Sequence, residues 1–243
     1  MKLSVVIPIF NEEKTIERIV DEVLGEQTPK EIIIIDDGST DGTWSIIQKS
    51  KSIALRSKNQ NYNEKLKIIR NEKNKGKGYS VRKGIQEATG DVLIIQDADL
   101  EYNPNDYSRL LEPILERKTE VVYGTRLKEL KFRLFGKNKT PMPLHYLVNR
   151  FLSFLTNILY GLHLTDMETC YKMMTRKVYE QLELKSNRFD IEPEITAKIA
   201  KKGYKIIEIP ISTKPRNYNE GKKIRAKDAL IAVLTLVKYR VNI

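Results

Sequence analysis

Short apolar runs, rich in β-branched residues, alternate with helical patterns along the first half of the chain, and this alternation constrains the fold more than any other feature. The runs lie at 3–9, 32–35, 66–69, 91–96 and 121–124. Apolar residues at helical spacing separate them, at 16–24, 44–47, 79–88 and 106–118. Strands that alternate with helices predict an α/β fold with a mainly parallel sheet flanked by helices. In such a sheet, ligands bind beyond the carboxyl ends of the strands.

The pattern changes in the second half. A basic segment at 128–143, which we expect to be a mobile loop, leads into a wide apolar helical face at 144–162. The remaining elements that we expect are a strand at 170–174, a helix at 191–202, a strand at 204–211, a basic loop at 212–225 and a last amphipathic helix. Two local breaks are also expected: 49–65 is typical of a polar surface excursion, and Pro113 should distort its helix.

The chain is strongly basic, with 43 Lys and Arg against 32 Asp and Glu in 243 residues, a formal net charge of +11. Such a surface attracts the phosphates of nucleic acid, an anionic membrane or a substrate, although it can also serve solubility alone. We expect no nucleic-acid partner, because neither an aromatic and basic RNA platform nor a helix-turn-helix pattern is apparent.

The single cysteine and the hydropathy pattern indicate a cytoplasmic protein. Cys170 cannot form a disulfide within the chain, which fits a reducing compartment, and we interpret it as a packed apolar residue. No secretory signal is apparent. The apolar stretch at 229–237 is shorter than the roughly 20 residues that a membrane-spanning helix needs, so we expect no span.

Carboxylates directly follow the fourth apolar run. Asp97 and Asp99 flank Ala98, and Glu101 repeats the spacing once more. Side chains at i and i+2 of an extended chain project to one side, here where an α/β sheet opens to its ligand. Oxygen ligands suit Mg²⁺ or Mn²⁺, which would bridge two phosphates. A helix cap or a turn is the alternative interpretation of this pair.

Three further motifs lie at strand ends or helix starts. Asp36 and Asp37 close the second run, where a carboxylate can bind a base or a ribose, although a turn with a helix cap is the alternative. Lys77 lies between glycines before a helix, an arrangement that suits an anion but also an ordinary basic loop. Arg126 follows the fifth run and could hold a phosphate through its planar guanidinium, or be an exposed surface arginine.

These motifs resemble those of the family 2 glycosyltransferases, which have the Rossmann-like GT-A fold. The resemblance covers nearly the whole chain and rests on VVIPIFNEE (5–13), IIDDGSTDGT (34–43), NKGKGYSVRKG (74–84), GDVLIIQDADLEYNP (90–104) and YGTR (123–126). Within the family, the chain is similar to the polyprenyl-phosphate branch, the dolichyl-phosphate mannose and glucose synthases, through LTDMETCYKMM (164–174), RFDIEPEI (188–195) and PRNYNEGKKIR (215–225). The resemblance implies one GT-A domain over 1–243, with a nucleotide-sugar and metal-binding half at 1–126 and an acceptor-binding half at 127–243.

The resemblance also implies roles for individual residues. The metal, Mg or Mn, and the diphosphate would be held by Asp97, Asp99 and Glu101. The nucleotide-sugar site would contain Pro8, Phe10, Glu12, Asp36, Asp37, Lys77, Asp97, Ala98 and Asp99. The acceptor phosphate, or closure of a loop over the site, would involve Arg126, Arg216 and Lys222. Two features depart from the family pattern: the position of Glu101 is often Gln, and many polyprenyl-phosphate members carry transmembrane helices after the catalytic domain, whereas this sequence ends at Ile243.

The leading hypothesis is an inverting transfer of a hexose from UDP-glucose or GDP-mannose to polyprenyl or dolichyl phosphate. A metal ion would neutralise the departing nucleoside diphosphate. A phosphate acceptor is already anionic and needs no general base. The alternative is transfer to a sugar hydroxyl of a polysaccharide or glycolipid, for which Asp166 is a candidate base, and nucleotidyl transfer is a more distant alternative.

The helical face at 144–162 holds more large apolar residues than a solvated surface needs. Packing against the domain core is the commonest explanation. The second hypothesis is that Phe151, Phe154 and Leu155 lie in the headgroup region of a bilayer, because the basic loop before them would be drawn to anionic lipid. We therefore expect peripheral attachment at the cytoplasmic face of a membrane, directly or through a membrane protein partner. The loop residues expected to matter most are Lys131, Arg133 and Lys137.

Overall fold

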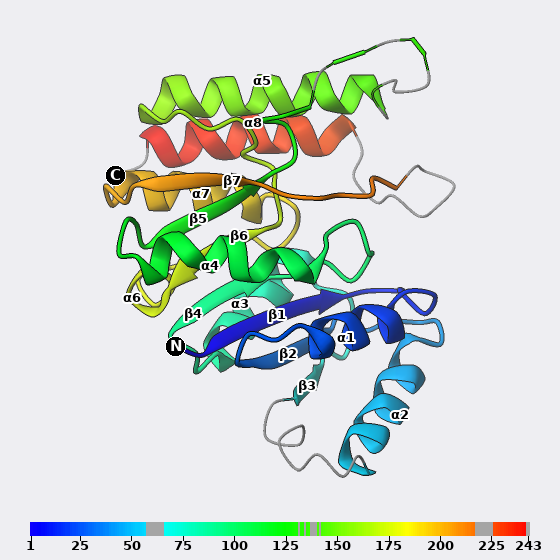
Figure 1. Cartoon of the computed structure of the whole chain (residues 1–243). Helices are drawn as coiled ribbons and strands as arrows, with labels where there is room; N and C mark the ends of the chain where they lie inside the picture. The colour runs from blue at the N-terminus through cyan, green and yellow to red at the C-terminus, as the bar shows by residue number, and fades with distance from the viewer. Residues whose placement is uncertain are drawn as a thin grey trace.

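The computed structural model describes residues 1–56, 66–130, 132–133, 135–136, 140, 142–216 and 226–241. Its strands, which form one sheet, are β1 (Leu3–Ile9), β2 (Lys30–Asp36), β3 (Leu66–Arg70), β4 (Val92–Ile95), β5 (Val121–Thr125), β6 (Lys172–Thr175) and β7 (Ile206–Pro210). The order across the sheet is β3-β2-β1-β4-β6-β5-β7 (Figure 1). The predicted α/β fold with a mainly parallel sheet is confirmed.

One strand, β6, runs antiparallel to both of its neighbours, β4 and β5. The chain leaves β5 at its carboxyl end, passes through the helix that follows and returns to the same edge, where Lys172 pairs with Tyr123. β6 must therefore run back across the sheet. The residues just before β6 consequently lie at the edge of the sheet where the parallel strands end.

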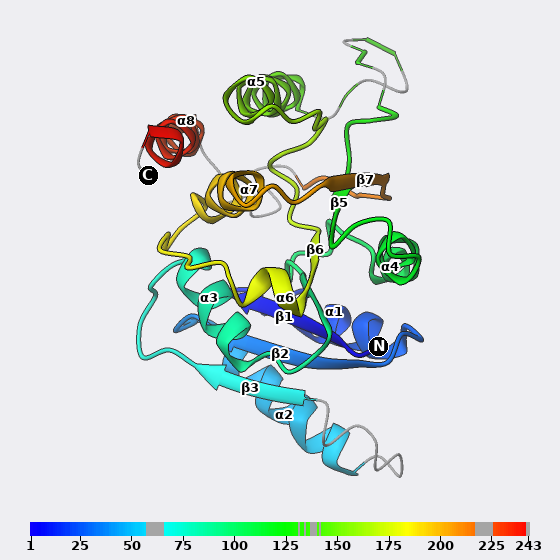
Figure 2. The ribbon, with the colours of Figure 1, turned by 90° about the vertical axis from the view of Figure 1, so that its left-hand side faces the viewer.

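Helices cover both faces of the sheet. They are α1 (Ile16–Gly25), α2 (Thr43–Arg56), α3 (Lys77–Glu87), the 3₁₀ turn η2 (Pro104–Asp106), α4 (Tyr107–Leu115), α5 (Pro143–Tyr160), α6 (Arg176–Tyr179), α7 (Ile191–Lys201) and α8 (Ala226–Val241). The views agree that α1 and α4 lie on one face and α3 and α7 on the other (Figures 1 and 2). All residues of β1 and β2 are buried, as expected for strands covered on both faces.

Two local predictions need correction. The segment from 49 was expected to be a surface excursion, but α2 continues to Arg56, and 57–65 lie outside the described residues. The fourth helix was expected to run to 118 with a distortion at Pro113; it ends at Leu115, two residues after the proline. The helix ends because Arg117 takes the left-handed conformation, with φ +56, and the N–H groups of Arg117 and Lys118 donate to the carbonyl oxygens of Ile114 and Pro113.

The helices α5 and α8 lie side by side at the end of the molecule opposite β3 and α2 (Figures 1 and 2). The side of α5 that carries Leu152, Leu155 and Leu159 packs against the core, while Phe151 and Phe154 are exposed. Core packing is thus confirmed for one side of the helix, to which the partly buried Leu155 belongs, and placement of Phe151, Phe154 and Leu155 in a bilayer stays a prediction. Within the described residues, none of the helices has the length and apolarity that crossing a bilayer requires.

Candidate active site

A cavity of about 340 Å³ opens where β1, β2 and β4 end. Most of the residues predicted from the sequence line it, namely Pro8, Phe10, Glu12, Asp37, Lys77, Asp97, Ala98, Asp99, Glu101, Arg126 and Arg216. Two predicted residues, Asp36 and Asp166, do not line it, and Lys222 lies outside the described residues. The cavity is therefore at the place where the fold predicts a ligand.

Asp37 organises one end of the cavity. Its buried carboxylate accepts hydrogen bonds from the Asn71 amide at 2.8 Å and from the backbone N–H groups of Lys75 and Gly76, at 3.0 and 2.7 Å. Gly76 has φ +100, and a Cβ there would lie 2.2 Å from the carbonyl oxygen of Asn187. The loop before α3 thus takes a conformation that requires glycine, and this conformation brings Lys77 to the cavity.

Asp36 points away from the cavity. Its carboxylate lies 3.1 Å from the Arg70 guanidinium and accepts a hydrogen bond from the backbone N–H of Ser39. These contacts join the ends of β2 and β3 and shape the turn after β2. They support a structural role, and direct binding of a nucleotide by Asp36 stays a prediction.

Lys77 bridges two carboxylates. Its ammonium lies 2.8 Å from Asp97 Oδ1 and 3.0 Å from Glu192 Oε1. Burial opposes this charge, but the neighbouring carboxylates outweigh it and raise the pKa of Lys77. A second, fully buried ammonium, that of Lys172, lies 2.6 Å from Glu192 Oε2 and donates to the carbonyl oxygen of Met167. Along this wall of the cavity, acidic and basic side chains therefore alternate, in the order Asp97, Lys77, Glu192, Lys172.

Arg216 pairs with the remaining carboxylates of the cavity, those of Glu12, Asp99 and Glu101. Its guanidinium lies 3.0 Å from Asp99 Oδ2 and 3.2 Å from Glu12 Oε2, and its backbone N–H donates to Glu101 Oε1 at 3.0 Å. Burial, together with the charges of Asp97 and Glu101, raises the pKa of Asp99 to about 7. Negative charge is therefore concentrated in this site, and a bound cation would stabilise the ionised carboxylates.

The carboxylates fit Mg²⁺ or Mn²⁺ by their chemistry, because both ions prefer oxygen ligands. Among the residues that the structure describes, however, no three acidic, His or Cys side chains converge in a ligand arrangement. Arg216 and Lys77 lie against these carboxylates instead. Asp97, Asp99 and Glu101 would hold the ion once these two cations give way.

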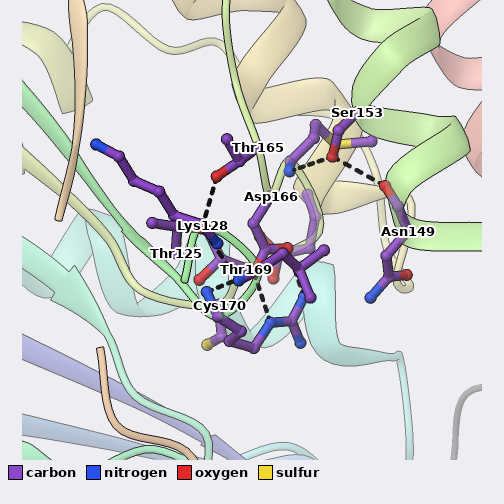
Figure 3. Close-up of polar contacts among 12 residues, drawn as sticks. Thr125, Lys128, Asn149, Ser153, Thr165, Asp166, Thr169 and Cys170 are labelled. Atoms are coloured by element: carbon purple, nitrogen blue, oxygen red, sulfur yellow. Dashed lines mark hydrogen bonds and ion pairs between the residues drawn. The ribbon is translucent and has the colours of Figure 1, made fainter. Parts of the chain in front are cut away.

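Arg126 is held by a buried partner. Asp166 is fully buried, and its two oxygens accept hydrogen bonds of 2.7 Å from the Arg126 guanidinium, with a third of 2.9 Å from the Arg126 backbone. Thr125 and Thr165 bond to each other beside this pair at 2.7 Å (Figure 3). The geometry supports Asp166 as the residue that positions Arg126, while its role as a general base stays a prediction.

Three charged residues of the cavity wall were not assigned from the sequence: Glu168, Arg188 and Glu192. Each lies within a motif that carried the family resemblance, at 164–174 or 188–195, so the signal was present without a role attached to it. Cys170 is buried, as interpreted, and also lines the cavity, and burial raises the pKa of its thiol.

Comparison with known proteins identifies the family. The family model described as Glycosyl transferase family 2 matches residues 4–183. The UDP-N-acetylglucosamine–dolichyl-phosphate N-acetylglucosaminyltransferase of Methanococcus voltae is 31% identical over 238 residues, which cover 94% of this chain and 91% of that protein. The dolichol-phosphate mannosyltransferase of Pyrococcus furiosus is 34% identical over 129 residues, or 52% of this chain and 33% of that protein.

Solved structures agree on the fold. Glucosyl-3-phosphoglycerate synthase from Mycobacterium tuberculosis, in complex with Mn²⁺, uridine diphosphate and glucosyl-3-phosphoglycerate, superposes with a TM-score of 0.71 at 18% identity. The match covers 100% of this chain and 80% of that chain. The sequence motifs, the cavity at the strand ends and these likenesses lead to one conclusion: the chain belongs to glycosyltransferase family 2 and is a glycosyltransferase of the GT-A fold.

Proposed function

We propose that the protein transfers a hexose from a nucleotide sugar to polyprenyl or dolichyl phosphate, with inversion at the anomeric carbon. The half at 1–126 would bind the donor, and the half at 127–243 would bind the acceptor. The observation that carries this proposal is a single cavity lined both by the paired carboxylates Asp97 and Asp99 and by the arginines Arg126 and Arg216. Relatives that act on dolichyl phosphate, by their names, support the choice of acceptor.

The residues divide the chemistry between them. Asp37 and the loop that it holds would bind the nucleoside, and Lys77 would bind the diphosphate. Mg²⁺ or Mn²⁺, bound by Asp97, Asp99 and Glu101, would neutralise charge on the departing nucleoside diphosphate. Arg126, oriented by Asp166, would hold the acceptor phosphate through its planar guanidinium. A phosphate needs no proton removed before attack, which agrees with Asp166 being fully engaged by Arg126.

Product analysis tests this proposal. The purified protein would be incubated with Mn²⁺, a polyprenyl phosphate, and UDP-glucose, GDP-mannose or UDP-N-acetylglucosamine in turn. We expect a glycosyl phospholipid and one nucleoside diphosphate per turnover, and loss of activity by orders of magnitude in Asp99→Asn. Pyrophosphate release from a nucleoside triphosphate would favour nucleotidyl transfer, and turnover only with a hydroxyl acceptor would favour the polysaccharide or glycolipid reaction. Undiminished turnover of Asp99→Asn would remove the metal mechanism.

We also propose that the protein works as a peripheral protein at the cytoplasmic face of a membrane, docked through α5 and α8. Exposed apolar residues follow helical spacing on both helices: Leu144, Leu147, Phe151, Phe154 and Ile158 on α5, and Leu230, Leu234, Val237 and Val241 on α8. Apolar surface of this extent marks a site of protein or membrane contact. The net charge of +11 and a lipid acceptor favour an anionic bilayer as the partner.

Co-sedimentation with vesicles that contain phosphatidylglycerol tests the docking surface. We expect salt-sensitive binding by the wild type, and at least a fivefold loss of bound protein, on the order of 1 kcal/mol, in Phe151→Asp combined with Phe154→Asp. Leu115→Asp is the matched control, because Leu115 is an exposed apolar residue of α4. Replacement of Lys131, Arg133 and Lys137 with Glu should weaken binding and raise KM for the lipid acceptor, while affinity for the nucleotide sugar stays constant; Lys131 and Lys137 lie outside the described residues. If the wild type ignores these vesicles at low salt, direct docking is wrong, and a membrane protein partner replaces it.

A further inference from the structure

Glu168 is a charged residue of the cavity wall to which the reaction described above gives no role. Its Oε1 atom is buried and has no hydrogen-bond partner among the described residues. A buried carboxylate oxygen without a partner is unfavourable, so such atoms are uncommon in folded proteins. Glu168 also lines the cavity, so its carboxyl group is a natural acceptor for a group of the substrate.

The backbone around Glu168 is held firmly. The N–H of Asp166 donates to Glu208, and the N–H of Met167 donates to the Ser153 hydroxyl at 2.9 Å. The buried ammonium of Lys172 donates to the carbonyl oxygens on both sides, those of Met167 and Thr169. Glu168 therefore extends from a fixed loop, which is the arrangement that precise recognition of a substrate needs.

The order of the strands gives Glu168 its place along the cavity. Asp37 follows β2, Asp97 follows β4 two strands further on, and Glu168 precedes β6, the next strand after β4. The donor binds along this edge, with its nucleoside at Asp37 and its diphosphate at Asp97 under the proposed function. The sugar, which follows the diphosphate, then falls on the side of Glu168.

We propose that Glu168 accepts a hydrogen bond from a hydroxyl or amide group of the transferred sugar and so contributes to the selection of that sugar. This inference rests on the proposed function, because it requires a nucleotide sugar in the cavity. Burial raises the pKa of Glu168 to about 7, which agrees with a carboxyl group whose Oε1 atom has no hydrogen-bond partner in the described part of the chain. Glu192, a second glutamate of the cavity wall without an assigned role, is already paired with Lys77 and Lys172.

Calorimetric titration in Mn²⁺ separates the sugar from the rest of the donor. Wild type, Glu168→Ala and Glu168→Gln would be titrated with UDP, UDP-glucose and UDP-N-acetylglucosamine, and with GDP and GDP-mannose. We expect Glu168→Ala to weaken binding of the preferred nucleotide sugar roughly ten- to hundredfold, as for loss of a charged hydrogen bond, and to leave binding of the free diphosphate within about twofold. Glu168→Gln, which keeps an acceptor oxygen, should fall between the two. Glu180→Ala, at an exposed glutamate outside the cavity, is the control and should match the wild type.

The outcomes distinguish this inference from the proposed function. The dissociation constants to compare are those of the nucleotide sugar and of its free nucleoside diphosphate. If their ratio in Glu168→Ala equals that of the wild type, whether both constants stay the same or both rise together, the role of Glu168 in sugar binding is overturned. If the wild type binds none of the nucleotide sugars, the proposed function fails and the inference falls with it. A loss confined to the nucleotide sugar, with thermal unfolding of the variant close to that of the wild type, supports both.

Discussion

The buried ion pair between Arg126 and Asp166 gives the sharpest test of how the site is held together. Asp166 is fully buried, and three hydrogen bonds of 2.7, 2.7 and 2.9 Å join it to Arg126. Asp166→Asn preserves the shape of the side chain but removes its charge, and its amide group meets the guanidinium as a second donor. Arg126 is then left in a largely buried site without its counter-charge.

The magnitude follows from this burial. Removal of one partner of a buried ion pair costs about 3–5 kcal/mol, a large share of the roughly 5–15 kcal/mol that stabilises a typical domain. With a urea dependence of about 3 kcal/mol per molar, the midpoint of unfolding should fall by about 1–2 M. Turnover with a phosphate acceptor should fall as well, because Arg126 loses the group that orients it.

Urea unfolding, followed by far-UV circular dichroism, measures the effect for Asp166→Asn, Arg126→Met and the double variant. Replacement of both partners removes the unpaired charge, so the double variant should be more stable than the sum of the two single changes predicts, by at least about 2 kcal/mol. Glu120→Gln is the control, because its ion pair with Lys177 is exposed and worth under about 1 kcal/mol. Additivity of the two single changes within about 0.5 kcal/mol would refute the coupling.

Three further predictions concern stability, each measured by urea unfolding. Gly84→Ala should destabilise the protein by about 1–3 kcal/mol, because a Cβ there would lie 2.3 Å from Val6 Cγ1, and Val6→Ala should restore part of the loss; a neutral Gly84→Ala would contradict this close packing of α3 on β1. The pKa of Glu31 is lowered to about 2, because its hydrogen bonds outweigh burial, so its stabilisation is complete above pH 4.5 and disappears as the pH falls through 2. Glu31→Gln should therefore be less stable than the wild type at pH 7 and equal to it near pH 2, and an equal difference at both pH values would refute the assignment. The pKa of Glu168 is raised to about 7, so the folded state keeps a proton that the unfolded chain releases above 4.5, and wild-type stability should decline between pH 5 and 8 relative to Glu168→Gln; parallel pH profiles would argue against it.

The sequence was sufficient for the sheet and for one side of the site. Strands such as β1 and β2 are continuous apolar runs. Such runs can be recognised in the sequence, because a strand that is buried on both faces needs apolar residues on both. The motifs of Asp37 and Asp97 directly follow such strands, so their place at the carboxyl edge of a parallel sheet followed from the rhythm of the chain. The outcome for Asp36 differs, because adjacent residues at a strand end point in opposite directions.

Contacts between distant segments were decided by the tertiary structure alone. Arg216 meets Glu12 across 204 positions of sequence, and Lys172 reaches Glu192 and the loop of Glu168 through the antiparallel course of β6. Local spacing carries no information about such pairs, because the chain path between the segments determines which charges are buried together. The sequence by itself determined which functional groups are available to the site, namely carboxylates at strand ends and basic groups nearby. Only the folded chain decided which of these groups neutralise one another and which, like Glu168, keep a buried oxygen that has no partner in the described part of the chain, because burial and pairing are properties of three-dimensional packing.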